Sequence, residues 1–87
     1  MLEGSLLVVE DDRQLLESMA DWLRSHGLSV DTAAGYGDAL EQLAQQKYEM
    51  VLADVRLGDG DGFDLLEQVR RNYPECHVIL MTGYGDP

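Results

Sequence analysis

Three apolar stretches of the sequence each run directly into residues that could do chemistry. The pairs are Leu6–Val9 with Glu10–Asp12, Met50–Ala53 with Asp54, and Val78–Met81 with Thr82. Carboxylates packed within a few ångströms of one another repel, which costs stability unless a cation lies among them. Oxygen ligands without His or Cys nearby favour a hard ion such as Mg²⁺. Beside such an ion, a carboxylate can attack a phosphoryl group and become an aspartyl phosphate.

These residues can meet only if the apolar stretches are neighbouring strands of one sheet. Each stretch is continuously apolar rather than alternating, which is typical of parallel strands buried on both faces. A weaker strand is expected from Leu28 to Thr32. In open parallel sheets, sites form at the carboxyl ends of the strands, near the point where the strand order reverses. We therefore expect the acids and Thr82 at one edge of the sheet.

Segments with helical spacing separate the predicted strands. The first has an apolar stripe that should face the core, begins near Asp11-Asp12 and ends at His26-Gly27; the stripe is Leu15, Met19, Trp22 and Leu23. A second helix is expected from Tyr36 to about Lys47. A third is marked by Leu66, Val69 and Tyr73 and stops before Pro74. Strands that alternate with helices predict an α/β fold with a parallel sheet.

Each candidate residue also has a simpler structural interpretation. Asp11 and Asp12, taken alone, are more often helix caps than ligands. Asp54 could be the first residue of a turn, and so could Thr82 before Gly83. The chemical interpretation depends on all of them falling on the same edge of the predicted sheet.

The composition narrows the classes of function. Seventeen acidic and six basic residues give a net charge of −11 over 87 residues, which disfavours direct binding to nucleic acid or to anionic membranes. The longest apolar run is far too short to span a bilayer, and the first residues lack the pattern of a signal peptide. The single cysteine, Cys76, fits a reducing compartment. A cytoplasmic location is expected.

Taken together, the motifs resemble the receiver domain of two-component response regulators. The resemblance runs from about Ser5 to Gly85 and is carried by Leu7–Asp12, by Leu52–Leu57 with Gly60 and Gly62, and by Leu80–Gly85. The last stretch and the loop after Asp54 are similar to those of transcriptional regulators, including enhancer-binding activators.

The resemblance implies a fold, a reaction and partners. The fold would be a flavodoxin-like sheet of order 2-1-3-4. Asp54 would accept a phosphoryl group from a sensor histidine kinase, and Thr82 would contact a phosphoryl oxygen. Asp11, Asp12, Asp54 and the backbone carbonyl of Arg56 would hold Mg²⁺. The module would regulate an output domain, most simply a DNA-binding one, and would not be an enzyme beyond its own phosphorylation and dephosphorylation.

Two parts of the family's pattern have no counterpart before Pro87. The family uses a lysine after a fifth strand and an aromatic residue within that strand; the only lysine here, Lys47, ends the second predicted helix and cannot replace it. Residues 1–87 are therefore interpreted as the N-terminal portion of a receiver domain, without the fifth strand and the last two helices, and with impaired activity. An apolar fourth strand at a sheet edge is a template for pairing, so self-association is expected.

Two other functions are considered. Haloacid-dehalogenase-type phosphatases also form an aspartyl phosphate at a strand end, but they place a second Asp two residues after the nucleophile, where this sequence has Arg56. A degenerate receiver that only docks to partners or dimerises is disfavoured by the complete acidic set and by Thr82.

Overall fold

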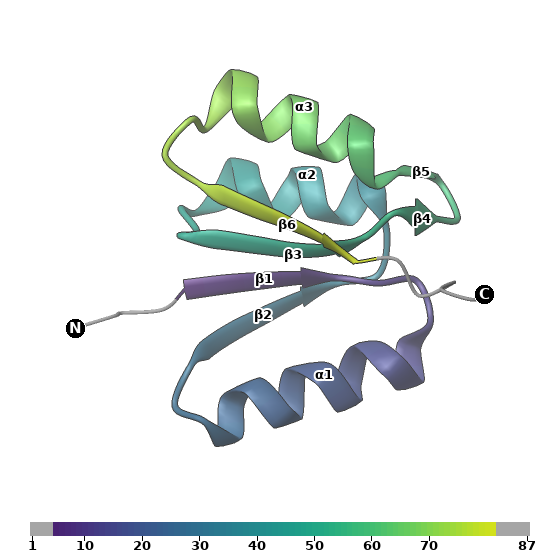
Figure 1. The fold of residues 1–87 in the computed structure, drawn as a ribbon, viewed down its shortest axis with the longest axis vertical. Coiled ribbons are helices and arrows are strands. Elements are labelled where there is room, and N and C mark those ends of the chain that lie inside the picture. The colour runs from purple at the N-terminus through teal and green to yellow at the C-terminus, as the bar shows by residue number, and fades with distance from the viewer. Residues whose placement is uncertain (1–4, 82–87) are drawn as a thin grey trace.

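The computed structural model describes residues 5–81, which contain one four-stranded parallel sheet (Figure 1). Its strands are β1 (Ser5–Val9), β2 (Ser29–Ala33), β3 (Met50–Asp54) and β6 (His77–Met81). They lie in the order β2-β1-β3-β6. This is the order 2-1-3-4 predicted from the sequence, so the predicted fold class is confirmed.

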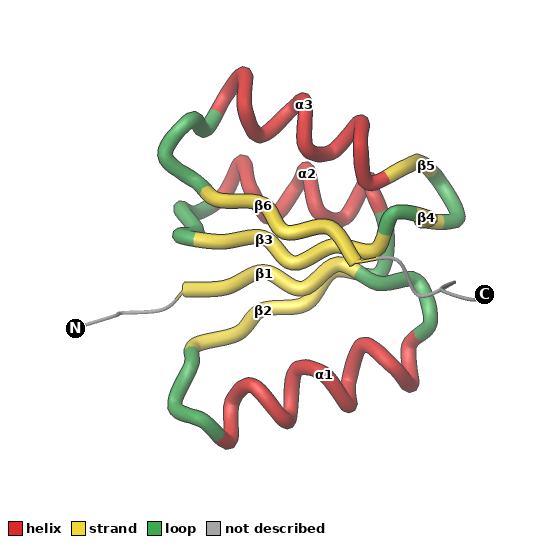
Figure 2. Tube along the Cα trace, viewed as in Figure 1, coloured by secondary structure: helices red, strands yellow, loops and turns green. Residues whose placement is uncertain are grey.

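Helices cover both faces of the sheet, but not equally (Figures 1 and 2). Helix α1 (Arg13–Ser25) lies on one face, where it packs mainly on β1 and β2. Helices α2 (Tyr36–Gln45) and α3 (Gly62–Asn72) lie on the other face. Between β3 and α3 the chain forms a small antiparallel hairpin of β4 (Arg56–Leu57) and β5 (Gly60–Asp61).

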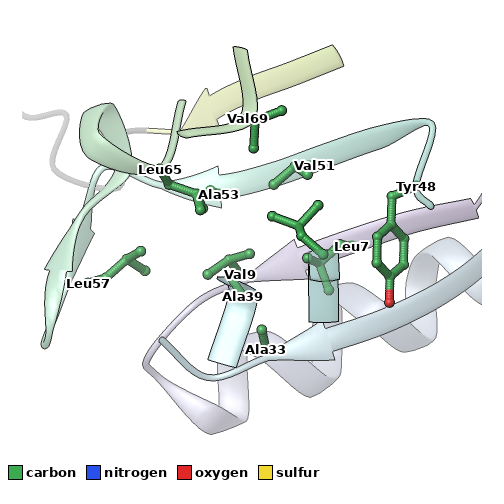
Figure 3. Packing of buried hydrophobic residues seen from close by; sticks show 11 residues of the cluster. Leu7, Val9, Ala33, Ala39, Tyr48, Val51, Ala53, Leu57, Leu65 and Val69 are labelled. Atoms are coloured by element: carbon green, nitrogen blue, oxygen red, sulfur yellow. The ribbon is translucent and has the colours of Figure 1, made fainter. Parts of the chain in front are cut away.

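The hydrophobic core is divided by the sheet into two layers. On the side of α2 and α3, fully buried residues from β1, β3 and α3 pack together (Figure 3); they include Leu7, Val9, Val51, Leu65 and Val69. The alternate residues of β1, Leu6 and Val8, pack on the other face with residues of α1 and β2. Burial on both faces explains why β1 is continuously apolar.

Helix α1 turns only part of the predicted apolar stripe toward the core, because Met19 and Leu23 pack against it while Leu15 and Trp22 do not. Its buried residues are Leu16 and Ala20, whereas Trp22 is 63% exposed and Leu15 is 47% exposed. The expectation that Trp22 packs in the core is therefore wrong. Because α1 covers β1 and β2, its flank toward β3 is left open, and Trp22 lines an apolar groove there with Leu52 and neighbouring residues of α1.

The helix boundaries follow from local caps. Asp12 is the N-cap of α1, with its carboxylate accepting from Leu15 N at 3.2 Å, and Gly27 ends this segment with a φ of 87°. Helix α3 begins before the predicted residues because the Asp61 carboxylate accepts from Phe63 N at 2.6 Å. Within residues 5–81, no helix is long and apolar enough to cross a membrane.

Candidate functional site

Two buried carboxyl groups lie side by side at the carboxyl ends of the central strands. Val9 of β1 pairs with Ala53 of β3, and Glu10 and Asp54 are the next residues along the two strands. Glu10 N also donates to Ala33 O at 3.1 Å, which extends the pairing of β1 with β2 by one residue. Glu10 is 3% exposed and Asp54 is 8% exposed; they are the only buried acidic residues in the described part of the chain. Buried acids at a strand end are uncommon without a purpose or a partner.

The electrostatics at this edge favour a bound proton or cation. Burial raises the pKa of Glu10 to about 7; a hydrogen bond from Asp12 N to Glu10 Oε2 at 3.0 Å opposes this, while the nearby carboxyls of Asp54 and Asp11 add to it. Negative charge is therefore concentrated here. The side-chain groups that could bind a metal here are all carboxylate oxygens, which suit a hard divalent cation such as Mg²⁺.

The predicted metal ligands reach the same edge but do not form a complete ligand set. Asp11 and Asp12 are exposed and follow β1, and the Asp12 carboxylate caps α1. Among residues 5–81, no three His, Cys, Asp or Glu side chains are arranged so that they could hold a metal ion. The carboxylates would have to move together around an ion. The metal-binding roles of Asp11, Asp12 and Asp54 stay predictions.

The backbone after Asp54 is tightly held. Arg56 N donates to Asp54 Oδ1 at 3.3 Å, and Gly62 N donates to Val55 O at 2.7 Å. A Cβ atom at Gly62 would lie 2.6 Å from the Asp54 carbonyl oxygen, a contact that real Cβ atoms avoid. Only glycine therefore allows α3 to start this close to Asp54.

The end of β6 is also joined to the loop that follows Asp54. Val55 N donates to Met81 O at 3.0 Å. The predicted phosphoryl contact, Thr82, follows Met81 but lies outside the described residues. Lys47 is at the opposite edge, because its carbonyl oxygen accepts from Ser5 Oγ at 3.2 Å, at the beginning of β1. Lys47 is thus remote from Asp54.

Comparison with known proteins identifies the family. The model of the response regulator receiver domain matches residues 6–87. The chain belongs to this family. The match favours the receiver interpretation over the haloacid dehalogenase alternative.

Several curated response regulators are similar to this receiver domain. The photosynthetic apparatus regulatory protein RegA of Cereibacter sphaeroides is 37% identical over 85 residues, which are 95% of this chain and 45% of RegA. The response regulator protein FleR of Pseudomonas aeruginosa is 39% identical over 87 residues, covering 97% of this chain and 18% of FleR. The receiver domain described here thus spans less than half the length of these relatives.

Solved structures show the same fold. The response regulator TrrA of Thermotoga maritima, in complex with Mg²⁺-BeF, superposes with a TM-score of 0.89 at 26% identity over 94% of this chain and 71% of that one. A CheY-like receiver domain protein of Methanospirillum hungatei gives a TM-score of 0.90 at 30% identity over 98% of this chain and 68% of that one.

Two residues at the receiver site were not singled out by sequence reasoning. Glu10 was grouped with the two acids after it, although only Glu10 is buried. Its position directly after a continuously apolar strand was the available signal. Asp59 lies at the tip of the β4–β5 hairpin. No local sequence pattern indicates its role, because its carboxylate accepts from the distant Tyr36 and Gly37 amides of α2.

Proposed function

We propose that this receiver domain is a phosphoacceptor module in which Asp54 takes a phosphoryl group from a sensor histidine kinase. The observation that carries the proposal is the placement of Asp54, buried at the end of β3 beside Glu10 and with one oxygen held by Arg56 N. A carboxylate in this position is fixed in direction and surrounded by further acidic oxygens. Both features suit a nucleophile in phosphoryl transfer.

The proposed reaction is a single in-line displacement. An Asp54 carboxylate oxygen attacks phosphorus and forms an O–P bond, while the bond from phosphorus to the imidazole nitrogen of a phosphohistidine breaks. The electron pair of that bond stays on the nitrogen of the departing histidine. Arg56 N–H orients the carboxylate through Oδ1, and Thr82 would contact a phosphoryl oxygen. Mg²⁺, held by Asp11, Asp12, Asp54 and the Arg56 carbonyl, would neutralise charge on the phosphoryl oxygens.

The relatives support a role in gene regulation. The transcriptional regulatory protein GlrR of Escherichia coli is 35% identical over 92% of this chain, and the chain covers only 18% of GlrR. We therefore extend the proposal to an output domain, most simply DNA-binding, whose activity the phosphorylated receiver would control. The sensor histidine kinase would phosphorylate this receiver domain in the cytoplasm.

Phosphorylation by a small-molecule donor tests this proposal. With acetyl phosphate and Mg²⁺, the chain is expected to gain the mass of one phosphoryl group, as measured by intact mass spectrometry. Chelation of Mg²⁺ with EDTA should prevent the gain, because the charge of the phosphoryl oxygens is then left beside the acidic edge. A chain that gains no phosphoryl group from the donor or from any purified histidine kinase is a docking module, and the proposal is then wrong.

Self-association of this chain is the second part of the proposal. Strand β6 is an edge strand of the described sheet, and Ile79 on it is 47% exposed. In register with Ile79 is Leu52 of β3, which lines the apolar groove beside Trp22. Within residues 5–81, no helix covers β3 and β6 on the face of the sheet where α1 packs on β1 and β2 (Figure 1). A second copy would bury the same kind of apolar surface that it exposes.

We expect a concentration-dependent rise in molecular mass by light scattering. Added salt should strengthen the association, because it screens the repulsion between two chains of net charge −11. Ile79→Lys should weaken it. Phe63→Lys is the matched control, since Phe63 is 57% exposed but lies on α3. A monomer at all concentrations, or an equal effect of both variants, would contradict the proposed surface.

A further inference from the structure

The N-terminus of α2 is capped by a residue from a distant loop. Its own N-cap, Gly35, has no side chain to accept from the first amides of the helix. Instead, the two carboxylate oxygens of Asp59 accept from Tyr36 N at 2.7 Å and from Gly37 N at 3.0 Å. These bonds, first that from Gly37 N and then that from Tyr36 N, lower the pKa of Asp59. A carboxylate at a helix N-terminus is favoured by the helix dipole as well.

The backbone on both sides of this contact is shaped to allow it. A Cβ atom at Gly35 would lie 2.7 Å from Asp59 Oδ1, and one at Gly60 would lie 2.7 Å from Tyr36 Cγ. A side chain at Gly60 would displace Tyr36, and one at Gly35 would push the Asp59 carboxylate away from the helix, so both glycines favour the contact. We name the contact between Asp59 and the N-terminus of α2 the hairpin clasp.

The hairpin that the clasp holds also forms part of the candidate site. Arg56 and Leu57 of β4 pair with Asp61 and Gly60 of β5, so the strand pairing connects the tip of the hairpin to its base. At the base, Arg56 N bonds to Asp54 Oδ1. Near the tip, a Cβ atom at Gly58 would lie 3.3 Å from Asp11 Oδ2. Fixing Asp59 on α2 therefore fixes the Arg56 backbone beside Asp54.

We propose that Asp59 is a positioning residue, which holds the Arg56 backbone in place for Asp54 by clasping the β4–β5 hairpin to α2. The inference rests on the proposed function, because the Arg56 carbonyl is the backbone ligand proposed for Mg²⁺. Asp59 itself is exposed, its carboxylate bonds to the amides of α2, and it is not among the ligands proposed for Mg²⁺. The base of the hairpin is also held by the buried Leu57 and by the Arg56 N and Gly62 N hydrogen bonds, and the clasp adds the hydrogen bonds that join its tip to α2.

The first test needs no metal. In the metal-free protein, Asp59→Ala is expected to speed hydrogen exchange at the Arg56 and Gly62 amides, measured by NMR, while amides of β1 and β3 keep their rates. Asp38→Ala is the matched control. Asp38 is an exposed acid in the first turn of the same helix, so its loss removes the same charge without touching the hairpin. Unchanged exchange in Asp59→Ala, or equal exchange in both variants, overturns the inference whatever the chain does with phosphate.

The second test separates positioning from simple capping. Asp59→Ala is expected to weaken Mg²⁺ binding, measured by calorimetry, about tenfold, as loss of an outer partner of a metal ligand does. Asp59→Asn keeps one acceptor oxygen and should recover part of the affinity, whereas Asp38→Ala should leave it unchanged. A lower melting temperature with unchanged Mg²⁺ affinity would make Asp59 only a helix cap and contradict the proposal. Absence of Mg²⁺ binding by the wild-type chain would instead count against the proposed function, and the exchange experiment would still decide on the clasp.

Discussion

Asp54→Asn is expected to abolish phosphorylation of the chain completely. The amide nitrogen and oxygen of asparagine keep the shape of the carboxylate but have no negatively charged oxygen to attack phosphorus. The substitution should leave the fold intact, because it removes a charge from beside the buried Glu10 rather than adding one. Intact mass spectrometry after reaction with acetyl phosphate and Mg²⁺ should show only the unmodified mass.

A matched variant shows whether the loss is specific to the site. Asp64 is an exposed acid in the first turn of α3 and contacts neither Glu10 nor Arg56 in any described hydrogen bond. Asp64→Asn makes the same change of charge and should be phosphorylated like the wild type. A phosphorylated Asp54→Asn variant would assign the acceptor role to another residue.

Gly62→Ala is expected to be the most destabilising of the single-methyl changes at the glycines of the site. The new Cβ would lie 2.6 Å from the Asp54 carbonyl oxygen and 3.0 Å from Val55 Cα, and these backbone atoms cannot turn away as a side chain can. Overpacking of this kind costs about 1–3 kcal/mol of the free energy of unfolding. Urea denaturation followed by circular dichroism measures the loss.

Gly37→Ala is the control for this substitution. Gly37 lies within α2, and a Cβ there would meet its nearest atom, Asp59 Oδ2, at an ordinary distance of 3.4 Å. Alanine is a better helix former than glycine by about 1 kcal/mol, so this variant should be as stable as the wild type or more so. If Gly62→Ala is also neutral, α3 can shift away from Asp54, and the packing argument is incorrect.

The positions of the central strands could be predicted because they rest on a strong local signal. Continuous apolar runs such as Leu6–Val9 and Met50–Ala53 can be satisfied only in a sheet covered on both sides, and both lie within the observed strands β1 and β3. The resemblance to receiver domains then supplied the order of the strands. The carboxyl ends of neighbouring parallel strands necessarily meet at one edge, so Asp54 and the acids after β1 could be brought together without coordinates.

The buried side of α1 was harder to predict than the strands. Apolar residues surround more of this helix than the sheet covers, and helical periodicity alone does not say which of them face it. Leu16 and Ala20 are buried on β1 and β2, while Trp22 lies at the open flank. The outcome depends on where α1 sits across the sheet, which is a property of the packed fold rather than of the segment.

The β4–β5 hairpin after β3 could not be predicted from the sequence, for a different reason. Strands of two residues, such as Arg56–Leu57, are too short for any period to show. The glycines of this segment lie close to the acidic site, with Gly58 against Asp11 and Gly62 against Asp54. The cap that Asp59 provides joins residues more than twenty positions apart, and local capping rules search only the residues beside a helix.

The central claim is that Asp54 is the residue that accepts the phosphoryl group, and chemical trapping tests it most directly. Borohydride reduces an aspartyl phosphate to homoserine: one hydride displaces phosphate to give the aldehyde, and a second hydride with a proton from water reduces the aldehyde to the alcohol. Wild-type chain that has reacted with acetyl phosphate and Mg²⁺ can be reduced in this way, digested and sequenced by tandem mass spectrometry. We predict homoserine at position 54 and at no other position. Reduction at Asp11, at Asp12 or at Glu10, with Asp54 intact, would contradict the account.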